Sequence, residues 1–147
     1  MSVTRIAITM SFVAGLAGAA QASVSGALGK RVGSVQAAAF GSIVAALLLV
    51  ALALLSGRGA GIVDVVRQPA WLMISGFLGA GIVLTLAYAP SRIGTFATVA
   101  LMIAGQLLLG ALIDGFGWLG TDRIPLTTTR VIGLLLLTAG AALTLKR

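Results

Sequence analysis

Five long apolar runs dominate the sequence, and the short connections between them hold most of the charged residues. A helix of about 20 residues, rising about 1.5 Å per residue, crosses the hydrocarbon core of a bilayer. Backbone N–H and C=O groups inside lipid must pair within their own segment, which favours helices over open strands. We therefore predict transmembrane helices over residues 6–28, 34–56, 70–90, 93–114 and 129–145.

The connections between these runs are too short to separate domains. Lys30 and Arg31 stand in the first connection, Pro90 opens a tight hairpin in the third, and Thr127 can cap the fifth helix. With 17 residues, the fifth run must stand nearly upright or thin the bilayer locally. The predicted fold class is an all-α integral membrane protein, with residues 1–147 as a single transmembrane domain.

The tripeptide Ala20-Gln21-Ala22 resembles the cleavage site of a secretory signal. The apolar run nevertheless continues to Leu28 and ends in basic residues, as a spanning helix does. We therefore expect this segment to remain as the first transmembrane helix.

Composition places the chain in lipid. Of its 147 residues, 59% are apolar and 9% are charged, whereas soluble domains carry about 25% charged residues. So few charges cannot cover a soluble surface, which excludes ordinary cytosolic enzymes and nucleic-acid-binding modules. The net charge of +7 comes from residues that flank the apolar runs and do not form one patch. The bilayer is therefore the first partner predicted, and no nucleic acid is expected.

The chain has few of the side chains that enzymes use for catalysis. It contains no Cys, no His and no Glu, and its carboxylates are Asp64, Asp114 and Asp122. A catalytic triad, an acid–base pair of carboxylates or a zinc site cannot be assembled convincingly from this set. We therefore predict no enzymatic activity, no catalytic residue, no metal site and no cofactor, which leaves transport and scaffolding as function classes.

Lys and Arg are divided equally between the two sides of the membrane that five spans imply. The two sets of five are Arg5, Arg58, Arg67, Arg123 and Arg130 against Lys30, Arg31, Arg92, Lys146 and Arg147. The excess of basic residues that normally sets orientation is therefore zero. Two interpretations stay open: another feature or a partner decides the orientation, or the protein inserts both ways and pairs antiparallel.

Polar side chains inside spans are costly in lipid, so they indicate either contacts between helices or a substrate path. Gln106 lies near the middle of the fourth run. Gln21 lies in the second half of the first run, with Ser25 one turn further on. An amide in such a place can bond a neighbouring helix, a water or a substrate.

Asp114 is the only carboxylate at the edge of a span. It lies eight residues after Gln106, which places the two side chains two turns apart along the helix and about 80° around it. There it can bind a proton or a cationic substrate. The alternative is a structural carboxylate that fixes the Asp-Gly-Phe-Gly turn, with Arg123 or Arg130 as its partner.

Small residues recur at intervals of four along the first run, on rows that contain Gly15, Gly18 and Gly26. Such faces let helices approach closely in lipid, so we assign these glycines and Gly105 to helix packing, with the wall of a substrate cavity as the alternative.

Aromatic residues stand where a membrane interface is expected. Trp71 and Tyr88 bracket the third run, and Trp118 follows the fourth. We interpret all three as interfacial anchors.

A combination of short motifs in the second half resembles the YdcZ-type family of the drug/metabolite transporter superfamily. The motifs are Pro90-Ser-Arg-Ile-Gly94, Gly105-Gln106, Ile113-Asp-Gly-Phe-Gly117, Arg130-Val-Ile-Gly133 and Ala139-Gly140. The resemblance continues more weakly upstream, through Gln21 and Gly29-Lys-Arg-Val-Gly33. One departure is Ser25, where the family commonly has Asn.

This resemblance implies a bacterial inner-membrane exporter of small molecules, drugs or metabolites. It also implies one half of a ten-helix inverted repeat, completed by an antiparallel homodimer or by an oppositely oriented paralogue. In our first hypothesis, Gln21, Ser25 and Gln106 would contact the substrate in a midplane cavity that is lined by the first, third and fourth helices and opens by alternating access, and Asp114 would tune charge or couple protons at its mouth. The competing hypothesis is a membrane scaffold or accessory subunit that binds another membrane protein.

Dual insertion makes a direct prediction for Arg92→Ala. Removing one basic residue from a balanced set should move the population to a single orientation. C-terminal reporters active only inside or only outside the cytoplasm would measure both populations. An orientation that is already single, and that does not respond to the change, would contradict dual insertion.

Overall fold

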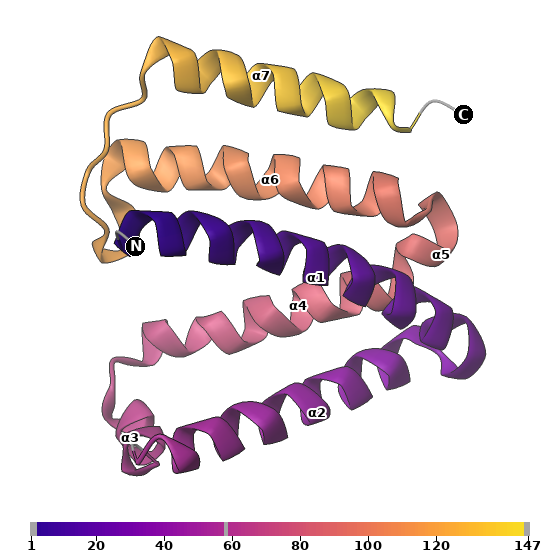
Figure 1. Cartoon of the computed structure of the whole chain (residues 1–147), viewed down its shortest axis with the longest axis vertical. Coiled ribbons are helices and arrows are strands. Elements are labelled where there is room, and N and C mark those ends of the chain that lie inside the picture. The colour runs from indigo at the N-terminus through magenta and orange to yellow at the C-terminus, as the bar shows by residue number, and fades with distance from the viewer. Residues whose placement is uncertain (1–2, 58, 146–147) are drawn as a thin grey trace. The chain divides into compact units, whose positions relative to one another are not determined.

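The computed structural model describes residues 3–57 and 59–145, so Arg58, Lys146 and Arg147 of the charge count lie outside the described residues. All regular structure in this part of the chain is helical (Figure 1). The elements are α1 (Val3–Val32), α2 (Ser34–Leu55), α3 (Ala60–Asp64), η1 (Val65–Arg67), η2 (Ala70–Met73), α4 (Ile74–Tyr88), α5 (Pro90–Ile93), α6 (Thr95–Phe116), η3 (Trp118–Gly120) and α7 (Thr128–Leu143).

The prediction of an all-α membrane protein is confirmed. Within the described residues, four helical stretches are long and apolar enough to cross a membrane: Thr4–Val32, Ser34–Leu55, Ala70–Ile93 and Thr95–Phe116. The fifth run forms α7, a shorter apolar helix of 16 residues. At the usual rise this helix is about 24 Å long, less than the hydrocarbon core of about 30 Å.

Several helix ends differ from the predicted ones. α1 runs to Val32 and includes Lys30 and Arg31 in its last turn, where positive charge stabilises the negative end of the helix dipole. The third run is divided into η2, α4 and α5, and the break between α4 and α5 falls at Pro90, which has no N–H to continue the ladder and instead opens α5. The predicted second loop contains the short helices α3 and η1.

The chain divides into two compact units, and the boundary passes through α1. One unit, here called the α2–α4 unit, covers Ala20–Arg92. The other, the α6–α7 unit, comprises Met1–Ala19 and Ile93–Arg147. A single transmembrane domain stays a prediction, and the two units are described separately.

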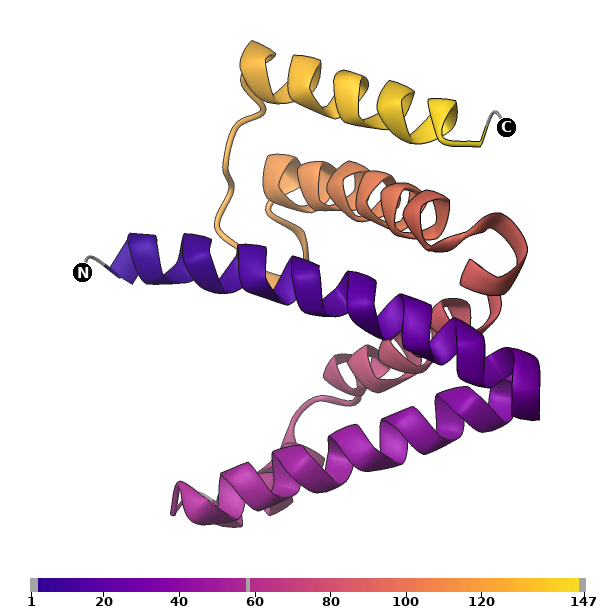
Figure 2. The ribbon, with the colours of Figure 1, turned by 45° about the vertical axis from the view of Figure 1, so that its right-hand side comes forward.

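In the α2–α4 unit, α2 and α4 pack against each other in opposite directions (Figures 1 and 2). The contact lies where α2 begins and α4 ends, and its buried core is Ala37, Ala38 and Ala87. Leu28, near the end of α1, packs against this core. The final turns of α1 and α4 are therefore held at the same end of the unit.

Glycines on α1 bring its backbone against α4 and α5. A Cβ on Gly29 would overlap the carbonyl oxygen of Ala87, which is main chain and cannot swing away. A Cβ on Gly26 would lie 2.8 Å from the Cβ of Pro90. Only glycine allows α1 to approach the end of α4 this closely.

The pattern of burial is opposite to that of a soluble protein, because small residues are buried and large apolar ones are exposed. Among the described residues, the buried apolar side chains are six alanines and Leu86. Large side chains face outward, for example Leu55 (85% exposed) and Phe77 (80% exposed). Because lipid is as apolar as leucine, burying a large apolar side chain away from it gains no free energy. The contacts between helices are therefore made by small residues, which allow close packing.

The close approach at Gly29 predicts opposite effects for two Gly→Ala substitutions. Gly29→Ala should destabilise the protein by about 1–3 kcal/mol, because the new methyl group displaces backbone. Gly41→Ala, in α2, is the matched control, since a Cβ there meets no described atom of its unit within 4 Å. It should gain up to about 1 kcal/mol from helix propensity. Unfolding of both variants in mixed micelles would measure the difference, and equal stabilities would contradict the tight crossing.

Candidate functional site

A cavity of about 350 Å³ lies between α6 and α7. We call it the polar cavity, because its wall contains an amide, a carboxylate and a guanidinium. Its lining residues are Gln106, Leu107, Gly110, Ala111, Asp114, Leu126, Arg130, Gly133, Leu134 and Leu137. Small residues on both helices, Gly110 and Ala111 opposite Gly133, leave the space that larger side chains would fill.

Helix geometry places the three polar groups in one wall, with Gln106 about 12 Å along α6 from Asp114. Gln106 and Asp114 stand two turns apart on α6, as their spacing predicts. Arg130 belongs to the first turn of α7, which starts with Thr127 accepting a hydrogen bond from the backbone N–H of Arg130 (3.4 Å). Because α6 and α7 are antiparallel neighbours, the last turn of one faces the first turn of the other.

Asp114 and Arg130 form an ion pair across the cavity. The Nη1 of Arg130 lies 3.9 Å from the Oδ2 of Asp114, and the side chains are 50% and 40% exposed, respectively. At this length and exposure the pair is loose, and both groups keep capacity for further hydrogen bonds. A ligand can therefore engage either charge without first breaking a buried salt bridge.

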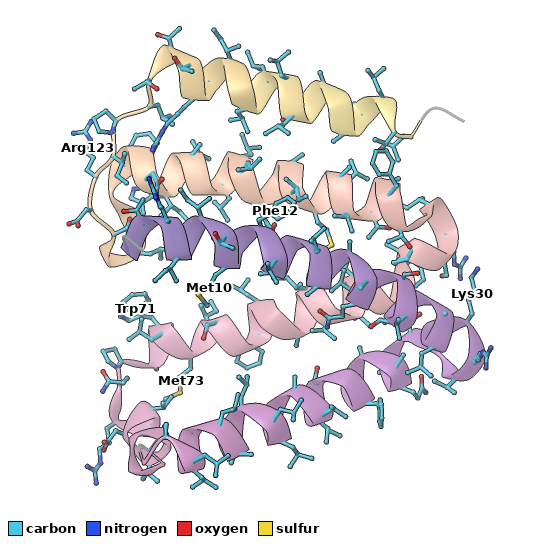
Figure 3. All side chains as sticks on the ribbon, in the orientation of Figure 1. Met10, Phe12, Lys30, Trp71, Met73 and Arg123 are labelled. Atoms are coloured by element: carbon cyan, nitrogen blue, oxygen red, sulfur yellow. The ribbon has the colours of Figure 1, made fainter. Side chains whose placement is uncertain are left out.

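The end of α6 is closed by the chain that leads back to α7. Gly117 adopts the left-handed conformation (φ 67°) that ends the helix. The N–H of Ile124 donates to the carbonyl oxygen of Asp114 (2.8 Å), and Nε of Arg123 donates to that of Gly115 (3.0 Å). Figure 3 shows Arg123 at this end of the unit. The predicted alternatives for the partner of Asp114 thus separate: Arg130 forms the ion pair, and Arg123 bonds the main chain.

A second cavity, of about 440 Å³, lies further along the same pair of helices. Its lining is almost entirely apolar and includes Phe96, Ile103, Leu136 and Ala141, and Leu137 belongs to both cavities. The space between α6 and α7 is therefore polar near the end of α6 and apolar towards its beginning.

The other two predicted substrate contacts, Gln21 and Ser25, belong to the α2–α4 unit. Gln21 is exposed and Ser25 is half-buried. Neither is among the lining residues of the polar cavity. Their part in a substrate path stays a prediction.

The glycines assigned to packing fall into two groups. Gly26 lies against Pro90, as described above. A Cβ on Gly15, Gly18 or Gly105 would meet no described atom of its own unit within 4 Å. For these three, helix packing stays a prediction.

The aromatic residues are each about half exposed: Trp71 53%, Tyr88 50% and Trp118 52%. Trp118 stacks on Phe116, with ring centroids 5.0 Å apart. Trp71 lies where η2 leads into α4, at the opposite end of the α2–α4 unit from Lys30 (Figure 3). Their role as interfacial anchors stays a prediction.

Sequence reasoning named Arg130 as an ion-pair partner but not as part of a cavity wall, and it did not single out Leu126. The sequence does contain a pattern that predicts the place of Arg130. The fourth and fifth runs are consecutive and antiparallel, so the last residues of one and the first of the other lie at the same membrane face. Leu126 could not be placed in this way, because it belongs to an irregular connection.

An all-α chain with several apolar helices of spanning length belongs to the class of multi-pass membrane proteins, and this one carries polar groups in a cavity between two of its helices. The chain is a member of the family described as "Putative inner membrane exporter, YdcZ", which matches residues 6–143. The protein is therefore a multi-pass inner-membrane protein, and its family is described as one of inner-membrane exporters. No curated protein and no solved structure matches the chain.

The loose ion pair predicts that Asp114 and Arg130 contribute little to stability. A double-mutant cycle with Asp114→Asn and Arg130→Gln should give a coupling energy below about 1 kcal/mol for unfolding in micelles. The exposed pair Asp64–Arg67 (3.2 Å) is the matched control and should behave alike. A coupling energy of several kcal/mol at Asp114–Arg130 alone would instead show a desolvated structural pair.

Proposed function

We propose that this chain exports small molecules and that the polar cavity between α6 and α7 contacts the substrate. The observation that carries the proposal is the meeting of Gln106, Asp114 and Arg130 in one wall, within a chain whose family is one of inner-membrane exporters. Charged and amide groups in spans are expensive to maintain, and they mark substrate pathways in membrane proteins.

The size and chemistry of the cavity support a small polar or amphipathic substrate. Ligand pockets typically measure about 300–1,000 Å³, and the polar cavity is at the lower end of this range. Gln106 can both donate and accept hydrogen bonds, whereas Asp114 and Arg130 offer opposite charges. The apolar cavity that continues past Leu137 can receive a hydrophobic portion of the same molecule.

We further propose that two chains work together by alternating access. A five-helix chain equals half of a ten-helix transporter built from inverted repeats, so the second half must come from an oppositely inserted chain. The equal numbers of basic residues on the two sides support an antiparallel homodimer, and an oppositely oriented paralogue would serve the same purpose.

Gln106→Ala tests the cavity directly. We expect it to abolish export, because the amide is the polar group furthest inside the span, while membrane insertion and self-association remain unchanged. Export can be measured before the substrate is identified, by untargeted comparison of the compounds released by cells with and without the protein. The matched control is Leu108→Ala, which removes an exposed side chain of α6 outside the cavity lining.

Wild-type export by Gln106→Ala would remove this residue from the substrate path. Absence of any released compound, together with a stoichiometric unrelated membrane partner in pull-downs of the wild-type protein, would favour the scaffold function instead.

A further inference from the structure

Three basic side chains gather at one end of the α2–α4 unit. Lys30 and Arg31 occupy the last turn of α1, and Arg92 stands in α5. The contacts of Gly26 with Pro90 and of Gly29 with Ala87 hold these two chain segments together. We call Lys30, Arg31 and Arg92 the basic end; Figure 3 shows Lys30 there.

The basic end has no acidic partner among the described residues. The ion pairs found in this part of the chain are Arg67–Asp64 and Arg130–Asp114. Arg67 and Asp64 belong to the connection before η2, at the other end of α2 and α4. The first turn of α2, which begins beside Arg31, contains no acidic residue either. Three positive charges therefore remain uncompensated on the basic end.

Arg92 contacts Tyr88, one of the predicted interfacial anchors. The guanidinium of Arg92 lies 5.0 Å from the centre of the Tyr88 ring, close enough for a cation–π contact. Ser91 donates a hydrogen bond from Oγ to the carbonyl oxygen of Tyr88 (2.7 Å) and so holds the turn that carries Arg92. Tyrosine at the end of a span favours the level of the lipid headgroups, so we expect Arg92 at the level of their phosphates.

Apolar side chains continue from the basic end into the span. Val24, two turns before Arg31 and on nearly the same face of α1, is 69% exposed, and Leu84, one turn before Tyr88 in α4, is 41% exposed. Cations above exposed apolar surface match a molecule with an anionic head and an acyl tail, whereas a soluble anion would use only the upper half of this surface.

We propose that the basic end binds the phosphate of an anionic phospholipid. Arg31 and Arg92 offer the planar fork that binds phosphate oxygens in pairs, and Lys30 adds a point charge. Each basic residue near an anionic membrane surface strengthens binding about fivefold, so two arginines account for roughly a 25-fold preference.

Lipid retention by the purified full-length protein tests this site. The protein is equilibrated in micelles that contain equal amounts of phosphatidylglycerol and phosphatidylcholine, and the lipids that co-purify with it are quantified by mass spectrometry. Wild type should retain phosphatidylglycerol preferentially. Arg31→Gln/Arg92→Gln should lower this preference at least tenfold, and Arg92→Gln alone should lower it several-fold if the double variant does not fold.

The matched control is Arg5→Gln/Arg67→Gln, which removes the same formal charge from positions outside the basic end. It should keep the wild-type preference. An equal loss in both double variants would show general attraction to the positive protein and would overturn the site. Displacement of phosphatidylglycerol by millimolar inorganic phosphate would show a site for free anions and would overturn the lipid assignment as well.

Discussion

The approach of one main chain to another, where α1 meets the end of α4, is the contact on which the α2–α4 unit depends. In lipid, apolar side chains gain nothing by leaving their surroundings, so helices associate by close packing and by polar contacts. Gly29 lets the backbone of α1 touch the carbonyl group of Ala87, and the alanine core beside it joins α2 to the same place. The basic end exists because this contact brings the ends of α1 and α4 together.

Small residues have a second role in the α6–α7 unit. Where a glycine meets backbone, as at Gly29, the two helices come into contact. Where small residues face each other, as Gly110 and Ala111 do with Gly133, the helices leave a cavity between them. The same residue types therefore produce tight packing in one unit and a lined space in the other, and the difference lies in what stands opposite them.

The helices themselves could be predicted well, because long apolar runs leave the backbone no alternative in lipid. The residues at which the helices end were harder to predict. The polarity of Lys30 and Arg31 indicates a loop, yet they extend α1, since positive charge at the end of a helix is favourable. In the polar cavity, Gln106 and Asp114 follow from the helical repeat alone, whereas the position of Arg130 requires the pairing of α6 with α7. Leu126 requires the path of an irregular connection, which no period in the sequence encodes.

The hydrogen bonds that close α6 also bear on how the chain enters the membrane during synthesis. The carbonyl groups of Asp114 and Gly115 receive their protein donors from Ile124 and Arg123, which the ribosome makes several residues later. Until then those carbonyls need water, so we expect the end of α6 to stay at the membrane surface while the connection is made. Once formed, these bonds tie the connection to α6 and hold α7 beside it as the second arm of a hairpin. A hairpin of this kind would spare the short last helix from partitioning into lipid alone.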